Sequence, residues 1–160
     1  IAGAISEAVD AAEGGIQSML DDAAMAVMTL NGGSAVPLWN TWLDGLQEEA
    51  PEGEEIDVAG LKAIFAKALE ELEDMSGAKV GDKTMMDALI PASEAVAAYT
   101  GDSADELFDA AAQAAAQGAE ATKQYVSKFG RAKSYGTKTI GTPDAGAVSM
   151  SWFFQGLARE

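Results

Sequence analysis

The sequence has no cysteine and no histidine. Without cysteine the chain can form no disulfide and has no thiolate nucleophile, and without histidine it has no imidazole base, no phosphorylated histidine and no histidine metal site. Any histidine that carries a phosphoryl group must therefore belong to a partner. A signal peptide and a long apolar run are also missing, so we expect a cytoplasmic protein that does not insert into membranes.

Aromatic residues make up only 7% of the chain, and β-branched residues are sparse beside the many alanines. This composition favours close-packed helices over sheet, and we predict an all-α fold. A length of 160 residues is typical of one domain, which we place at residues 1–160. Because the chain starts at Ile1 and not at Met, we expect it to be part of a longer protein.

Basic residues are scarce too, and the net charge is −16. Long-range repulsion at this charge argues against binding to nucleic acid or to an anionic membrane surface. The few cations are unevenly placed, because residues 1–61 contain no Lys or Arg while five cations lie between residues 123 and 138. No Asp or Glu lies between Glu120 and Asp144. We therefore predict that this segment binds phosphate, with Arg131 as the best candidate because a guanidinium can hold two phosphate oxygens.

Apolar residues recur at helical spacing between turns marked by glycine, proline and acidic residues. Asp57 is placed to cap a helix, and Ser103 with Glu106 forms a capping box. Residues 129–142 are expected to be irregular. We expect about seven helices, at residues 1–13, 16–30, 36–47, 58–75, 84–99, 103–128 and from 144 or 146 onward.

The stretch from Gly77 to Pro91 sets a glycine-rich, charged turn against the start of an apolar helix. Asp82 can cap a helix that opens at Thr84, Lys83 adds a mobile positive charge, and the free N–H groups favour an anion. The alternative is a capped loop between helices with an incidental lysine. The spacing does not match a Walker A P-loop, which needs Lys-Ser/Thr directly after its second glycine and a strand before the first.

Three stretches in order resemble the nucleotide-binding (L-type) subunit or domain of dihydroxyacetone kinases. They are Asn31-Gly-Gly-Ser-Ala-Val-Pro-Leu38, the stretch from Gly77 to Pro91, and Gly130-Arg-Ala-Lys-Ser-Tyr135 followed by residues 140–147. The resemblance implies an up-and-down barrel of eight antiparallel helices with the nucleotide at one rim. The turns at 31–36, 77–83 and 129–146 are separated by even numbers of helices, so they can share that rim.

By this resemblance the cofactor is ADP or ATP with Mg²⁺, and the partners are a dihydroxyacetone-binding kinase subunit and, in one variant, a phospho-histidine protein of the sugar phosphotransferase system. Catalytic residues stay unassigned. The family's Mg²⁺ aspartates lie in a Gly-Asp-x-Asp-His-Gly loop, which would fall upstream of Ile1, so no metal ligand is assigned in this chain. The residues expected at the nucleotide are Asn31, Gly32, Gly33, Ser34, Gly81, Thr84, Met85, Arg131 and Asp144.

One departure from the family pattern concerns the first loop, where Val36 replaces a glycine and cannot adopt the positive φ open to glycine. Asp21 and Asp22 do not replace the missing metal loop, since they lie in a helical pattern without glycines. Two alternative functions stay open. One is a non-catalytic helical scaffold that has lost nucleotide binding, and the other is the nucleotide domain of a related fatty-acid-kinase-type enzyme.

Overall fold

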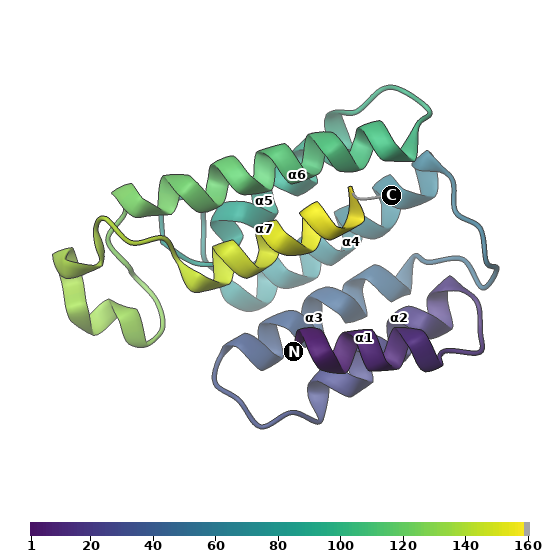
Figure 1. Cartoon of the computed structure of the whole chain (residues 1–160), viewed down its shortest axis with the longest axis horizontal. Coiled ribbons are helices and arrows are strands. Elements are labelled where there is room, and N and C mark those ends of the chain that lie inside the picture. Colours follow the sequence, from purple (N-terminus) through teal and green to yellow (C-terminus); the bar gives the residue numbers. More distant parts are fainter. Residues whose placement is uncertain (159–160) are drawn as a thin grey trace. The chain divides into compact units, whose positions relative to one another are not determined.

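The computed structural model describes residues 1–158, and within that range it contains helices but no strand. The predicted all-α class is confirmed, and so is the expected number of α-helices. The elements in chain order are α1 (Ala2–Ala11), α2 (Ile16–Met28), α3 (Ala35–Glu48), α4 (Val58–Ser76), α5 (Met86–Ala98), α6 (Ala104–Ala121), the 3₁₀ helices η1 (Thr122–Gln124) and η2 (Arg131–Thr139), and α7 (Ala145–Leu157) (Figure 1). None of these helices is long and apolar enough to cross a membrane.

The chain divides into two compact units, Ile1–Ser76 and the residues from Gly77 onward. In the first unit, helices adjacent in the sequence pack on each other, α1 on α2, α2 on α3 and α3 on α4. The rings of Trp39 and Trp42 meet edge to face with centroids 5.7 Å apart, and Trp42 also packs on Phe65. The two tryptophans are core residues.

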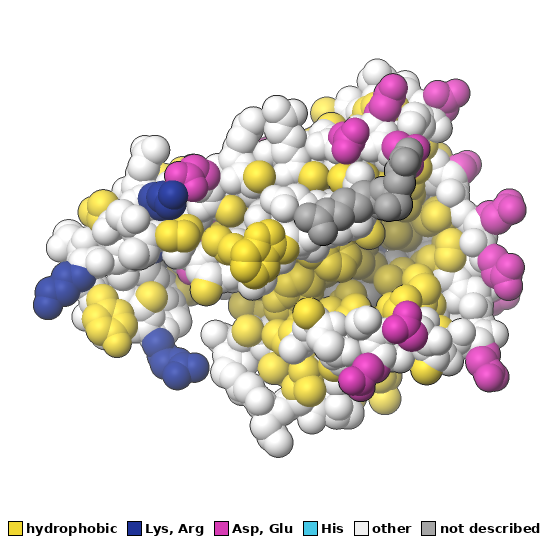
Figure 2. Space-filling model, in the orientation of Figure 1, with side chains coloured by type: hydrophobic (Ala, Val, Ile, Leu, Met, Phe, Trp, Pro, Cys, Tyr) yellow, Lys and Arg dark blue, Asp and Glu magenta, His cyan; other side chains and the backbone are white. Residues whose placement is uncertain are grey.

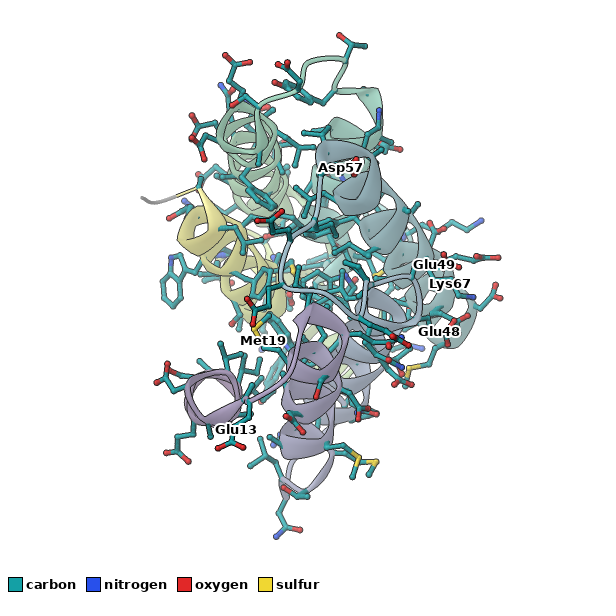
Figure 3. All side chains as sticks on the ribbon, turned by 90° about the vertical axis from the view of Figure 1, so that its right-hand side faces the viewer. Glu13, Met19, Glu48, Glu49, Asp57 and Lys67 are labelled. Carbon is teal, nitrogen blue, oxygen red and sulfur yellow. The ribbon has the colours of Figure 1, made fainter. Side chains whose placement is uncertain are left out.

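Asp57 caps α4 as predicted, because its Oδ1 accepts the N–H of Gly60 at 2.7 Å. On the same helix, Lys67 lies among three carboxylates and joins α4 to the end of α3 through Glu48, at 3.3 Å (Figure 3). The other two carboxylates belong to Glu70 and Glu71. The hydrogen bond that Lys67 donates to Glu71, followed by the one that it donates to Glu48, raises the pKa of Lys67 well above its usual value, so the side chain stays charged.

In the second unit α5 packs on α6, and α7 packs on both. Its core contains Leu89, Leu107, Met150 and Phe154, none of which is exposed to solvent. The predicted capping box at α6 is half formed, since Ser103 Oγ accepts the N–H of Glu106 at 3.3 Å. The Glu106 carboxylate instead accepts the hydroxyl of Tyr99, at 2.8 Å.

Residues 122–143, which connect α6 to α7, form what we call the cationic lobe (Figures 1 and 2). The prediction that α6 continues to residue 128 is wrong, because it ends at Ala121. The side chain of Thr122 forms two hydrogen bonds where α6 ends. Its hydroxyl donates to the Ala119 carbonyl at 2.6 Å and accepts the N–H of Asp144 at 2.8 Å. The lobe is not irregular throughout, since η2 consists of 3₁₀ turns joined at Gly136.

Candidate functional site

Asp87 organises the glycine-rich loop before α5. Its buried carboxylate accepts the N–H of Gly81 on Oδ1, at 2.6 Å, and the N–H of Thr84 on Oδ2, at 2.7 Å. Gly81 has a φ of 96°, a conformation that glycine adopts without the steric penalty of a side chain. The loop backbone is thereby held from within the helix that follows it, so the loop has a fixed shape.

The predicted cap of α5 by Asp82 is therefore wrong. The helix begins at Met86, and Asp82 lies too far upstream to reach its first free N–H groups. Asp82 instead accepts the N–H of Lys79 at 2.9 Å and forms an ion pair with Lys128 of the lobe at 2.6 Å. The hydrogen bond from Lys128, then that from Lys79, lowers the pKa of Asp82 below its usual value.

Lys83 is buried, with 4% of its surface exposed, so the prediction of a mobile charge is wrong. Its Nζ donates to the main-chain carbonyl oxygens of Thr122 and Thr139 at 2.7 Å and of Thr142 at 2.6 Å. Its φ of 60° is a left-handed conformation that costs a non-glycine residue about 1–3 kcal/mol. The burial of the ammonium is compensated by three hydrogen bonds, which join the glycine-rich loop to the lobe.

Asp144 lies where the lobe meets α7 and is the N-cap of that helix. Its Oδ2 accepts the N–H of Ala147 at 2.9 Å. Burial is the main cause that raises the pKa of Asp144, against the effect of the N–H groups of Ala147 and Gly146. The nearby charge of Asp87 raises this pKa further and that of Lys83 lowers it, so these three groups share one environment.

The predicted site residues of the second unit are brought together in part. Gly81 and Thr84 share the carboxylate of Asp87, and Met85 packs against the start of α7, where a Cβ at Gly146 would lie 3.2 Å from the Met85 Cβ. The side chain of Met85 is buried, so it packs in the core and does not face a ligand. Arg131 is exposed at the first position of η2.

The first unit contains the other predicted loop, Asn31, Gly32, Gly33 and Ser34, and all four residues are exposed. Ser34 precedes α3 without capping it through its side chain. Val36 lies in the first turn of α3, so no positive φ is required there and its replacement of a glycine causes no strain. That this loop joins the other two at one nucleotide stays a prediction.

The five cations of the lobe differ in their contacts. Lys123 pairs with Glu120 at 2.6 Å, and Lys128 pairs with Asp82. Arg131, Lys133 and Lys138 are exposed and form no ion pair within residues 1–158. Lys and Arg side chains gather over the lobe in Figure 2. Positive charge that is available to a ligand is thus concentrated on η2.

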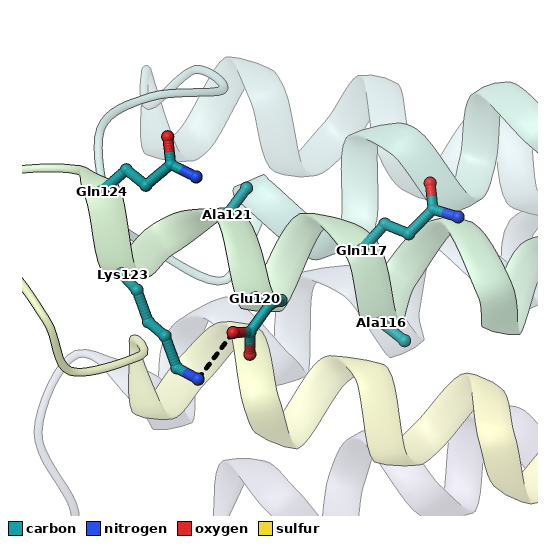
Figure 4. Close-up of a pocket in the computed structure, with 6 residues that line it drawn as sticks. All are labelled: Ala116, Gln117, Glu120, Ala121, Lys123 and Gln124. Carbon is teal, nitrogen blue, oxygen red and sulfur yellow. Dashed lines mark hydrogen bonds and ion pairs between the residues drawn. The ribbon is translucent and has the colours of Figure 1, made fainter.

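A depression lies along the C-terminal part of α6, next to the lobe (Figure 4). One side of it carries the ion pair between Lys123 and Glu120, which neutralises the cation there. It lacks the free positive charge of η2. The residues that line it are Ala116, Gln117, Glu120, Ala121, Lys123 and Gln124.

A magnesium site does not fit the described residues. Within residues 1–158 no three His, Cys, Asp or Glu side chains gather in a group that could hold a metal ion. The three aspartates nearest the loops, Asp82, Asp87 and Asp144, each accept backbone N–H groups as caps or turn supports. These residues therefore have no assigned role in binding a metal ion.

Fold and site together describe an all-α domain whose glycine-rich loop and exposed cations are suited to an anionic ligand. The chain belongs to the DAK2 domain family, whose model matches residues 1–159. This confirms the family that the three motifs indicated.

Named relatives fall into two groups. The L-erythrulose kinase of Pectobacterium atrosepticum is 35% identical over 153 residues, which cover 91% of this chain and 25% of that protein. The D-erythrulose kinase of Mycolicibacterium smegmatis is 34% identical, over 84% of this chain and 23% of the relative. The ADP-binding subunit DhaL of PEP-dependent dihydroxyacetone kinase 2 from Listeria innocua is 30% identical, over 91% of this chain and 67% of the relative. The chain thus spans about a quarter of the erythrulose kinases and two thirds of the subunit.

Proposed function

We propose that this chain is the nucleotide-binding part of a kinase that phosphorylates a small hydroxyketone. It would hold the phosphates of ADP or ATP while the acceptor is bound on a separate dihydroxyacetone-binding subunit or domain. The named relatives support this assignment, because they are ADP-binding subunits and kinases of dihydroxyacetone or erythrulose. Phosphoryl transfer needs charge neutralisation and positioning more than covalent chemistry from the protein.

The observation that carries the proposal is the exposed cation on η2. Arg131, at the N-terminus of η2, is free of ion pairs within residues 1–158 in a chain whose net charge is −16. An unpaired guanidinium beside glycine-rich backbone is suited to bidentate phosphate binding. Loop 31–34 would contribute backbone N–H groups. Gly81 and Thr84 would give the loop before α5 its fixed shape, since their N–H groups are held by Asp87, and Asp144 would close the site together with Arg131.

The phosphoryl donor has two possible sources within this proposal. ATP can be consumed and exchanged, or ADP can stay bound and be rephosphorylated by a phospho-histidine protein, as in a phosphotransferase system. The Listeria relative is named as PEP-dependent, which supports the second route. Residues 1–160 contain no histidine, so this route requires a phospho-histidine on another domain or protein.

Calorimetric titration with ADP in the presence of Mg²⁺ tests the proposal. We expect Arg131→Ala to weaken ADP binding by about 1.5–3 kcal/mol, which is the contribution of a hydrogen bond to a charged group. Lys123→Ala removes an equal charge from the same lobe, but that charge is already paired with Glu120, so its effect should be small. Equal losses in both variants would mean that binding is general electrostatics. No binding to the wild-type chain would favour a scaffold that has lost its nucleotide.

A further inference from the structure

We propose that Lys83 is a positioning residue that fixes the cationic lobe, and with it Arg131, where the nucleotide phosphates are held. The inference rests on the proposed nucleotide site. Lys83 lies on the glycine-rich loop, outside the lobe, and the sequence gives no indication that it contacts residues 39 to 59 positions further along. It would act on the ligand only through the lobe.

The geometry of the three hydrogen bonds carries the argument. An ammonium group has three N–H donors, and all three of Lys83 are used on main-chain carbonyls. Thr122 starts the lobe, whereas Thr139 and Thr142 lie near its end. One side chain therefore ties both ends of the lobe to the loop before α5. Thr139 also ends the second part of η2, which is joined at the Gly136 kink to the part that Arg131 begins.

Two further hydrogen bonds join the first part of the lobe to its last part. The N–H of Gly141 donates to the Lys123 carbonyl at 2.7 Å, and the N–H of Ser127 donates to the Thr139 hydroxyl at 3.1 Å. Lys83 is the buried charge among these contacts. Because a buried ammonium and a left-handed lysine are both unfavourable, this arrangement persists only where its hydrogen bonds form.

The ammonium group of Lys83 has no N–H left for a phosphate oxygen. A direct contact with the nucleotide would require it to release one of the carbonyls that it holds. This distinguishes Lys83 from a phosphate-binding lysine, which presents its ammonium to solvent or ligand. The expected signature is an effect on the order of the lobe first, and on ADP affinity as a consequence.

Amine acetylation of the wild-type protein, followed by mass spectrometry, tests the burial without any substitution. We expect Lys133 and Lys138, which are exposed, to react quickly, and Lys83 to react at least about tenfold more slowly. Acetylation of Lys83 as fast as Lys133 would refute the anchor.

Tryptic cleavage then tests the anchoring, because Arg131, Lys133 and Lys138 are cleavage sites inside the lobe. In Lys83→Met we expect cleavage at these sites to be about tenfold faster, while cleavage after Lys62 on α4 is unchanged. Lys128→Met removes the partly exposed ion pair with Asp82 and should change lobe cleavage by no more than about twofold. Lys83→Gly, which suits the φ of 60°, provides the same test if the Met variant does not fold. Unchanged lobe cleavage would overturn the proposal.

A double-mutant cycle with ADP binding completes the test. If Lys83 acts through Arg131, the losses of affinity in Lys83→Met and Arg131→Ala are not additive. Additive losses that shrink at high salt would mean that Lys83 acts as a remote charge, which overturns the positioning role. If the lobe loosens but neither substitution changes ADP affinity, the anchor stands and the proposed nucleotide site fails.

Discussion

At the scale of single residues, two aspartates at the site have pKa values displaced in opposite directions. Burial raises the pKa of Asp144 from its usual 3.8, whereas the bond to Lys128 lowers that of Asp82. The folded chain therefore binds the Asp144 proton more tightly than the unfolded chain does. Protonated Asp144 stabilises the fold below pH 3.8, and this contribution is lost as pH rises through the raised pKa. Asp82 stabilises the fold above pH 3.8, and its contribution is lost as pH falls through the lowered pKa.

These signs predict opposite pH profiles for two isosteric substitutions. The free energy of unfolding of Asp144→Asn should increase relative to that of the wild type as pH rises above 3.8, because the substitution removes the buried charge. Asp82→Asn should become less unfavourable as pH falls below 3.8, where the wild type also loses the ion pair. Urea unfolding of both variants between about pH 3 and pH 7 measures the profiles. Parallel profiles would contradict this account of the two carboxylates.

Asp87, in the first turn of α5, is predicted to matter more for stability than its position in the sequence indicates. Asp87→Ala removes the acceptor of two partly buried N–H groups, on Gly81 and Thr84, and should lower the free energy of unfolding by about 2–4 kcal/mol. Asp109→Ala, an exposed aspartate on α6, should change it by less than about 0.5 kcal/mol. Chemical denaturation compares the two variants, and similar small changes in both would show that Asp87 does not hold the loop.

At the scale of elements, the crossing of α5 and α6 depends on one glycine. A Cβ at Gly118 would overlap the carbonyl oxygen of Asp87 and lie 3.1 Å from the Ala88 Cα. The two helices thus meet backbone to backbone at the start of α5, directly beside the glycine-rich loop. Pro91, inside α5, has no N–H to give to the Asp87 carbonyl, so this oxygen is free to face the adjacent helix.

Gly118→Ala should therefore destabilise the protein by about 1–3 kcal/mol, because the helices must separate to admit the methyl group. The matched control is Gly156→Ala in α7, where a new Cβ meets nothing within 4 Å. That substitution should leave the stability unchanged or raise it by up to about 1 kcal/mol, because alanine has less conformational freedom than glycine in the unfolded chain. Thermal or urea unfolding separates the two, and a neutral Gly118→Ala would refute the close crossing.

The helices could be predicted from the sequence because apolar spacing and capping residues are local signals. The contacts of the loop could not. Lys83 and its acceptors are far apart in the chain, and the acceptors are main-chain carbonyls that leave no mark on side-chain type. Asp82 and Asp87 both follow the glycines, and the left-handed turn at Lys83 delays the helix to Met86, so that Asp87 and not Asp82 lies in its first turn.

At the scale of the whole molecule, strong negative charge coexists with a small free cationic surface on η2. A net charge of −16 repels anionic ligands at long range, so binding of a nucleotide must rely on short-range contacts in the lobe and loops. The motifs predicted Arg131 at this surface. They could not predict that Lys128 is already paired, because its partner Asp82 lies 46 positions before it in the sequence.

The central proposal is that ADP is held by the glycine-rich loop before α5 and the cationic lobe. Hydrogen exchange of the wild-type chain with and without ADP and Mg²⁺, followed by mass spectrometry, tests it most directly. We predict slower amide exchange in residues 77–87 and 122–147 when ADP is bound, and no change in α1. Binding that leaves residues 77–87 and 122–147 unprotected, or that protects only other helices, would contradict the site described here.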